Sequence, residues 1–258
     1  MRFASLGSGS EGNGLVVEAG GTRLLIDCGF SPRETSRRLS RIGLEPADLA
    51  GILVTHEHSD HTAGVWGLAR RCGLPVWITH GTLAALRESG ADIDASTEVR
   101  FIHGESGFAL GELEVFPFTV PHDAREPVQY VVSNGARRLG VLTDTGCSTP
   151  HIEEVLSGCE ALVLEANHDL DMLMAGEYPP TLKARVAGRL GHLDNGTAAG
   201  ILAAIDTSRL QHVVAAHLSQ KNNTPELARA AFSAALSCEE RFITAASQDE
   251  GFGWMEIR

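Results

Sequence analysis

Hydrophobic and polar positions follow two patterns along the chain. Short apolar runs predict buried strands, and the longer stretches between them have the apolar spacing of helices. Ser-Pro and Thr-Pro pairs precede several of these stretches, and a capping hydroxyl followed by proline favours a helix start. The predicted strands cover residues 2–6, 15–18, 23–27, 51–55, 75–79, 108–110, 113–120, 128–132, 138–142, 161–166, 211–216, 242–246 and 252–257. The predicted helices cover residues 31–43, 62–72, 82–89, 180–190 and 197–205, and two more begin at 149–150 and 224–225.

Strands that alternate with helices in this way predict an α/β fold. The sequence contains no internal repeat, low-complexity stretch or Pro/Ser-rich linker. A chain of 258 residues fits one large α/β domain or two small ones. We therefore expect a single domain over residues 1–258, built from two αβ halves that each supply a sheet and its flanking helices.

The composition narrows the class of protein. The chain is 43% hydrophobic, which is enough for a sizeable core, and no apolar run approaches the length of a membrane helix. A formal net charge of −12 indicates no broad basic surface, so nucleic-acid binding would need a local patch. The N-terminus has no signal-peptide pattern, and the five scattered cysteines form no C-x-x-C pair. We expect a cytoplasmic protein with reduced thiols.

The densest chemistry lies directly after the predicted strand 51–55. His56, His58, Asp60 and His61 follow one another there in the order H-x-H-x-D-H. Alternate side chains of an extended segment share a face, so His56 and His58 can bind one ion together. Asp60 and His61 follow where the chain turns and can reach a second ion. Imidazole and carboxylate ligands suit zinc, manganese or iron, and two adjacent ions can drive hydrolysis.

Other candidates also stand at strand ends. Asp27 is either a turn former or a hydrogen-bond partner for a metal-binding histidine, and we favour the partner. His122 and Asp144, taken alone, fit a metal ligand and an ordinary loop residue equally well. The lone His80 and His103 are expected to be structural. Arg33, Arg37, Arg38 and Arg41 form a basic stripe on the predicted helix 31–43, which we expect to be a solvated face rather than a nucleic-acid contact.

The segment Thr55-His56-Glu57-His58-Ser59-Asp60-His61 resembles the T-H-x-H-x-D-H signature of the metallo-β-lactamase superfamily. The resemblance implies a four-layer αββα sandwich, with two mixed sheets packed face to face and helices outside. It also implies an ion-bound hydroxide as nucleophile, oriented by Asp60, and two divalent ions such as Zn²⁺ or Mn²⁺. Asp27 and Glu57 are candidates to fix the ligand histidines. The implied ligands are His56, His58 and His122 for the first ion, Asp60, His61 and His217 for the second, and Asp144 as a bridge.

The second half of the chain resembles RNase Z in Leu164-Glu165-Ala166, Gly191-His192 and Ala216-His217-Leu218-Ser219. That resemblance makes His192 the proton donor to the leaving group, whereas on local sequence it fits a helix end as well. Nearly the whole chain is similar to the WalJ/YycJ group of bacterial proteins, including Pro121-His122-Asp123-Ala124 and Asn222-Asn223-Thr224-Pro225. Asp194 and Gln129 depart from the group's pattern.

The WalJ/YycJ resemblance implies a cytoplasmic, manganese-supported DNase that digests duplex ends from 5′ to 3′. DNA is then the expected partner, and the sequence leaves a homodimer open. Five residues are candidates for phosphate or sugar contacts, although turn formation or capping explains each of them equally well. They are Ser10, Asn13, Asn167, His168 and Asn222.

Two other functions stay open on the sequence. One is a small-molecule hydrolase for a cyclic phosphodiester, lactone or thioester, which the acidic charge favours and the Gly191-His192 segment disfavours. The other is a redox di-iron protein or metal-binding regulator. Redox members of the fold carry glutamate where this chain has His58, which disfavours that function.

Overall fold

The computed structural model describes residues 1–258 and contains two seven-stranded sheets. The first sheet has the order β14-β1-β2-β3-β4-β5-β6. Its strands β14, β1, β2 and β3 pair antiparallel, and β3 to β6 pair parallel. Its strands are β1 Arg2–Gly7, β2 Gly14–Ala19, β3 Thr22–Ile26, β4 Gly51–Leu53, β5 Val76–Ile78, β6 Val99–Phe101 and β14 Phe252–Glu256.

The second sheet repeats this plan with the order β13-β12-β11-β10-β9-β8-β7. Strands β7 to β10 pair antiparallel and β10 to β13 pair parallel, so both sheets are mixed. Its strands are β7 Phe108–Leu110, β8 Leu113–Thr119, β9 Val128–Ser133, β10 Arg138–Leu142, β11 Ala161–Glu165, β12 His212–Ala216 and β13 Ile243–Ala245.

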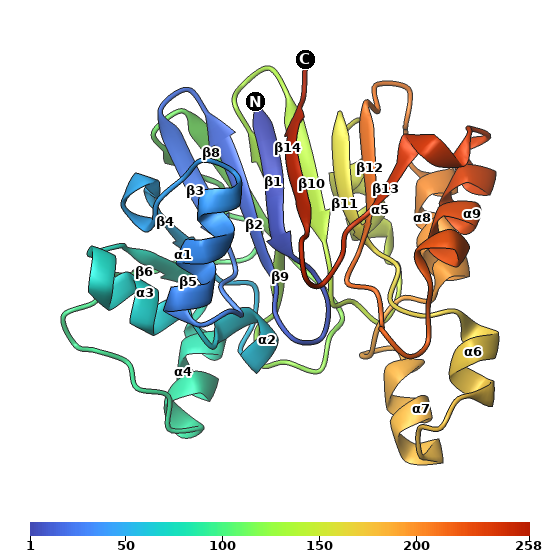
Figure 1. The fold of residues 1–258 in the computed structure, drawn as a ribbon, viewed down its shortest axis with the longest axis horizontal. Coiled ribbons are helices and arrows are strands. Elements are labelled where there is room, and N and C mark those ends of the chain that lie inside the picture. The colour runs from blue at the N-terminus through green and yellow to red at the C-terminus, as the bar shows by residue number, and fades with distance from the viewer.

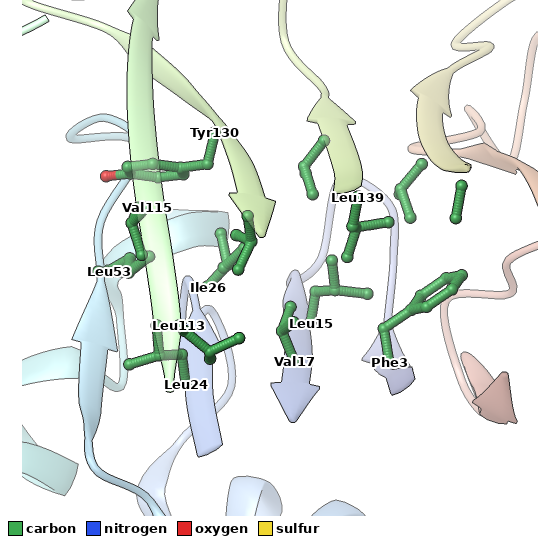
Figure 2. Packing of buried hydrophobic residues seen from close by; sticks show 14 of the residues in the cluster. Phe3, Leu15, Val17, Leu24, Ile26, Leu53, Leu113, Val115, Tyr130 and Leu139 are labelled. Carbon is green, nitrogen blue, oxygen red and sulfur yellow. The ribbon is translucent and has the colours of Figure 1, made fainter. Parts of the chain in front are cut away.

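The two sheets pack face to face around a shared apolar core. Figure 2 shows side chains of both sheets meeting there, among them Ile26 and Leu53 from one sheet and Val115 and Tyr130 from the other. These four side chains are almost completely buried, and each such burial contributes about 1.5–3 kcal/mol. Tyr130 also donates its hydroxyl to the Val54 carbonyl at 2.6 Å, which ties the second sheet to the end of β4.

Helices cover the outer face of each sheet, on opposite sides of the molecule (Figure 1). Helices α1, α3 and α4 bury an apolar cluster against the first sheet, and α5, α8 and α9 bury another against the second. The predicted four-layer αββα sandwich is therefore confirmed. None of the helices has both the length and the apolar character needed to cross a membrane. The helices are α1 Pro32–Arg41, α2 Ser59–Thr62, α3 Val65–Cys72, α4 His80–Glu88, α5 Pro150–Leu156, α6 Leu170–Ala175, α7 Pro180–Val186, α8 Asn195–Ala204 and α9 Pro225–Leu236, with 3₁₀ turns at Pro46–Asp48 and Glu240–Phe242.

The helix predicted over residues 62–72 is wrong in its first turn. A short helix, α2, begins earlier at Ser59 and ends at Thr62, and α3 begins at Val65. Gly64 lies between the two helices and packs closely against the loop that joins β3 to α1. A Cβ added at Gly64 would lie 1.9 Å from the carbonyl oxygen of Phe30. This contact between distant segments ends the first helix, and local sequence does not contain it.

Three further expectations need correction. His80 does not end a strand but is the first residue of α4, where Thr79 caps the helix. Strand β6 and helix α6 were not predicted at all. Arg38 is not part of a solvated stripe: it is 7% exposed, bonds to Glu34 at 2.6 Å and donates to the Leu6 carbonyl at 2.7 Å. Its guanidinium therefore ties α1 to the end of β1.

Candidate metal centre

The loops that follow the strands of both sheets converge at one edge of the sandwich, and all seven predicted ligands meet there. Ligand atoms within each of four groups lie within 4.8 Å of one another. The groups are His56, His58 and His122; Asp60, His61 and His217; His56, His61 and Asp144; and Asp144, Glu165, His192 and His217. The shared members make the four groups one continuous cluster, in which all seven predicted ligands take part.

The backbone at this edge is held in an uncommon conformation. The φ angles are 60° at Asp27, 52° at Asp144 and 55° at His217. They lie in the left-handed region, which residues other than glycine rarely adopt. Asp27 directly follows β3, and His217 directly follows β12. Asp144 is the second residue after the end of β10. Such conformations cost about 1–3 kcal/mol each and concentrate at functional sites. The fold accepts this strain where it turns the chain into the cluster.

The group of His56, His58 and His122 presents bare ring nitrogens to one point. The Nδ1 of His56 lies 2.9 Å from the Thr55 hydroxyl oxygen, and the Nδ1 of His122 donates to the Gly191 carbonyl at 3.1 Å. The Gly191 carbonyl can only accept, and Thr55 already donates its hydroxyl to Asp27, so both histidines carry their proton on Nδ1 and keep the Nε2 lone pair for an ion. The Nδ1 of His58 lies 3.3 Å from the Nε2 of His122. Three nitrogen ligands with fixed neighbours suit a divalent ion.

The second group, Asp60, His61 and His217, is oriented by buried carboxylates. The Nδ1 of His61 donates to Asp27 at 2.7 Å, and Asp27 also accepts the backbone N–H and the hydroxyl of Thr55. His61 Nε2 is left 3.3 Å from Asp60. Burial alone would lower the pKa of His61, but the nearby Asp144 and Asp27 carboxylates raise it well above its usual value. Asp27 therefore has the geometry predicted for a partner of a ligating histidine.

Glu165 is the residue that sequence reasoning missed. Its carboxylate is completely buried at the end of β11. One oxygen accepts the Nδ1 of His192 at 2.8 Å and of His217 at 3.2 Å, and the other accepts the backbone N–H groups of Thr145 and Leu193. Burial would raise the pKa of Glu165, but the adjacent imidazoles lower it to about 2. A charged residue closing an apolar strand was the available signal, as it was at Asp27.

The residues present fit divalent ions. His56 Nε2 is buried and has no hydrogen-bond partner in the protein, and the equally buried Asp144 Oδ2 has no hydrogen-bond donor in good geometry, although the Nε2 of His61 lies 3.0 Å away. Leaving a buried polar atom unpaired costs about 1–3 kcal/mol, and more when it is charged, so these atoms call for a cation. Nitrogen and carboxylate donors together match the ligand preferences of zinc and manganese alike. The cluster can therefore hold divalent metal.

The cluster opens into a cavity of about 190 Å³. Of the five predicted substrate contacts, Ser10 lines this cavity, together with Asp60 and His192. Asn13 is 7% exposed, and its amide lies 3.2 Å from Asp60 Oδ2 and also donates to the Gly9 carbonyl. Asn13 thus contacts two predicted ligands, because the same amide nitrogen lies 3.1 Å from the Nε2 of His61.

The other three predicted contacts lie under the surface. Asn167, His168 and Asn222 are at most 4% exposed. Asn167 donates to the His217 carbonyl at 3.0 Å and so supports a predicted ligand. The side-chain amide nitrogen of Asn222 lies 3.5 Å from the hydroxyl oxygen of Ser219. Direct contact with the substrate stays a prediction for all three residues. The hydrogen bonds described for Asn167 and Asn222 join them to other protein atoms.

The two departures from the WalJ/YycJ pattern have structural explanations. Asp194 caps α8 by accepting the backbone N–H groups of Gly196 and Thr197 at 2.8 and 3.0 Å, as serine does at such a position. Gln129 is buried in β9 and donates to the Thr143 carbonyl at 2.6 Å.

Glu57 was the other candidate partner for the ligand histidines. It instead accepts the backbone N–H of Arg125 at 2.7 Å.

Known proteins resemble this chain over most of its length. The family described as "Beta-lactamase superfamily domain" matches residues 22–217. Exodeoxyribonuclease YycJ of Bacillus anthracis is 38% identical over 98% of this chain and 91% of its own. Exodeoxyribonuclease WalJ of Streptococcus pneumoniae is 34% identical over 88% of this chain and 85% of its own.

Solved structures of the same fold cover the chain from end to end. The metallo-β-lactamase fold protein YhfI of Bacillus subtilis has a TM-score of 0.75 at 16% identity and covers 99% of both chains. The short form of human tRNase Z has a TM-score of 0.68 at 17% identity and covers 100% of both. At such identities the likeness concerns the fold alone. With the profile match and the two bacterial relatives, the chain belongs to the β-lactamase superfamily and, within it, to the group of the WalJ and YycJ proteins.

Proposed function

We propose that this protein is a divalent-metal-dependent phosphodiesterase that removes nucleotides from the 5′ ends of DNA. The observation that carries the proposal is the position of His192, on the wall of the same cavity as Asp60 and His58, with Glu165 behind it. Phosphodiester hydrolysis needs an activated water and a proton for the leaving oxygen. The predicted metal ligands would activate the water, and His192 would supply the proton from the wall of the same cavity. The relatives named exodeoxyribonuclease, which align over nearly the whole chain, support DNA as the substrate.

Each residue has a distinct part in the proposed reaction. Two ions, Zn²⁺ or Mn²⁺, held by the seven predicted ligands would polarise the attacking water and offset charge on the phosphate oxygens. Asp60 would accept a hydrogen bond from the attacking water and so orient it. Glu165 holds the Nδ1–H of His192, so that Nε2 faces the cavity and can deliver a proton to the leaving oxygen. The Asn13 amide keeps Asp60 in place.

The test is cleavage of end-labelled nucleic acid by the purified protein with manganese or with zinc. Duplex DNA, single-stranded DNA and a matched RNA are compared, each labelled at the 5′ or the 3′ end. We expect metal-dependent release of the 5′ label before shortening of the 3′-labelled strand. His192→Ala lowers the rate about 100-fold or more, because general acid catalysis contributes about 10²–10⁴-fold. Asp60→Ala abolishes cleavage.

The matched control is His103→Ala, which removes an exposed histidine far from the cavity and leaves the rate unchanged. Failure to cut any strand, with turnover of a small phosphodiester, lactone or thioester instead, would refute the nuclease and favour a small-molecule hydrolase on the same site. Wild-type cleavage by His192→Ala would refute the proton-donor role alone.

A further inference from the structure

The positive charges of this acidic protein are unevenly placed. The chain has only two lysines, Lys183 and Lys221. Residues 178–193 carry Lys183, Arg185 and Arg189 and no aspartate or glutamate, although the whole chain has a formal net charge of −12. Both lysines contact the segment before α7: Lys183 Nζ donates to the Met174 carbonyl, and Lys221 Nζ lies 5.7 Å from the centre of the Tyr178 ring. The two lysines thus gather at one place.

Only Arg185 among these cations is neutralised by the protein, through its ion pair with Asp123 at 2.7 Å. Lys183, Arg189 and Lys221 form no ion pair with a carboxylate, and Arg189 makes no side-chain hydrogen bond either. Elsewhere on the surface, exposed arginines commonly face an acidic neighbour, as Arg125 faces Glu88 at 2.7 Å. Cations left without carboxylate partners on a strongly acidic protein are available for an anionic ligand.

The same segment exposes apolar side chains. Leu190, Met174 and Leu170 are 53%, 50% and 47% exposed, and they are the three most exposed of the large hydrophobic side chains. Helix α7 buries no side chain, and α6 buries only Leu173. Figure 1 shows both helices projecting below the sheets at the lower right, away from the helices that cover the sandwich. The segment therefore contributes little to the core and presents most of its surface to solvent.

This surface is continuous with the candidate metal centre. Leu182, Arg185 and Val186 of α7 line the cavity that also contains Asp60 and His192. The Nε of Arg185 lies 2.7 Å from Asp123, the residue after the predicted ligand His122. A ligand that occupies the cavity would therefore pass directly onto α7.

We propose that residues 170–190 together with Lys221, which we call the basic arm, bind the nucleic-acid strand that extends away from the metal centre. The arm has four cationic side chains against two carboxylates, those of Asp171 and Glu177. The inference rests on the proposed function and adds where the substrate lies. Lysine and arginine side chains bind backbone phosphates and thereby set the register of a strand without reading its sequence. Exposed leucine and methionine side chains gain free energy when apolar parts of sugars and bases cover them. Lys183, Arg189 and Lys221 contact phosphates, and Leu190 and Met174 cover the neighbouring nucleotides.

A lipid surface also attracts basic and apolar side chains, but the basic arm is poorly built for one. Membrane-surface helices bury a continuous apolar face in the lipid boundary, whereas α6 and α7 have six and seven residues, about two turns or fewer. The arm also continues into the cavity of about 190 Å³ at a candidate hydrolytic site, which a bilayer surface cannot enter. Nucleic acid is therefore the ligand that the arrangement favours.

The test measures binding and cleavage separately in the metal-loaded protein. The variant Lys183→Gln/Arg189→Gln/Lys221→Gln is compared with wild type for binding of a fluorescent duplex whose terminal linkages are phosphorothioates. We expect affinity to fall about tenfold or more near 0.1 M salt, and the slope of log K against log salt to become shallower by about 2–3, since each phosphate contact contributes about 0.9. Duplex cleavage loses at least tenfold more in kcat/KM than hydrolysis of bis(4-nitrophenyl) phosphate.

The matched control is Arg33→Gln/Arg71→Gln/Arg87→Gln, which removes three exposed arginines without carboxylate partners from α1, α3 and α4. It keeps wild-type affinity and salt slope. Thermal melting of both variants verifies that they fold. If the wild type cuts DNA while the arm variant binds it with wild-type affinity and slope, the basic arm is refuted and the proposed function stands. A wild-type protein that neither binds nor cuts DNA overturns the basic arm and the proposed function together. If the arm variant keeps its DNA binding but loses binding to anionic phosphatidylglycerol vesicles, the arm belongs to a membrane contact instead.

Discussion

Replacing Glu165 by glutamine tests how the cluster is held together, because the side chain keeps its shape and loses its charge. Glu165 accepts four hydrogen bonds, two from imidazoles and two from backbone N–H groups. A glutamine offers one oxygen and one NH₂ group. The backbone donors cannot turn away, so the oxygen stays with them and the NH₂ group faces the two rings. His192 and His217 must then accept at Nδ1 and carry their proton on Nε2.

A proton on Nε2 removes the lone pair with which His217 would bind an ion. Loss of such a supporting contact costs about 10–100-fold in metal affinity or activity. His192 also loses the carboxylate that stabilises its doubly protonated form, and the neutral ring that remains is a far weaker acid although its proton is on Nε2. Removing the charged partner from a completely buried arrangement lowers the free energy of unfolding by about 3–5 kcal/mol as well.

Metal titration calorimetry, bound-metal analysis and urea unfolding of Glu165→Gln measure these effects separately. The matched control is Glu160→Gln, since Glu160 is equally buried and lies at the opposite end of β11, where it accepts the backbone N–H of Arg138 at 2.8 Å. We expect the control to lose stability and to keep its metal affinity. Wild-type metal affinity in Glu165→Gln, or an equal loss in Glu160→Gln, would refute the tautomer argument.

Four further outcomes are expected. Asp27→Asn removes the carboxylate that holds His61 and weakens metal binding about 10–100-fold in the same titration, whereas unchanged binding would contradict its orienting role. Tyr130→Phe leaves a buried carbonyl unpaired and lowers the free energy of unfolding by about 1–3 kcal/mol in urea, with no change in metal content. Burial raises the pKa of the Cys28 thiol to about 12 and that of Cys159 to about 11, so both stay protonated and resist a thiol-specific disulfide reagent at pH 8 until the protein is denatured. Removing metal with a chelator lowers the melting temperature, because the clustered ligand atoms are left without a cation, and readdition of manganese or zinc restores it.

Local sequence was sufficient for much of the fold. Alternating apolar runs and Ser-Pro or Thr-Pro starts located most strands and helices, since burial periodicity and capping act over a few residues. The H-x-H-x-D-H order located the metal loop for the same reason, because four ligand types stand within six residues. The family resemblance then supplied the four-layer architecture. That the whole chain is one domain and that each ligand binds an ion stay predictions.

Tertiary structure decided the features that depend on contacts between distant segments. The close approach of Gly64 to Phe30 ends one helix and begins another. Arg38 reads as a solvated residue in its helix pattern, yet the end of β1 lies over it and accepts its hydrogen bond. Glu165 is an unremarkable strand end in the sequence. Only the fold brings two histidines from separate loops to its one oxygen, and so makes it the hydrogen-bond centre of the site.

The basic arm shows the same division. The sequence by itself determined that lysines are rare and that residues 178–193 lack acidic side chains. It did not determine that Lys221 would lie beside Tyr178, or that α7 would line the cavity. The reason is physical: composition and short-range periodicity are fixed along the chain. The neighbours of a charge, and hence its hydration, pKa and partner, are fixed only when the two sheets close on each other and bring their loops to one edge.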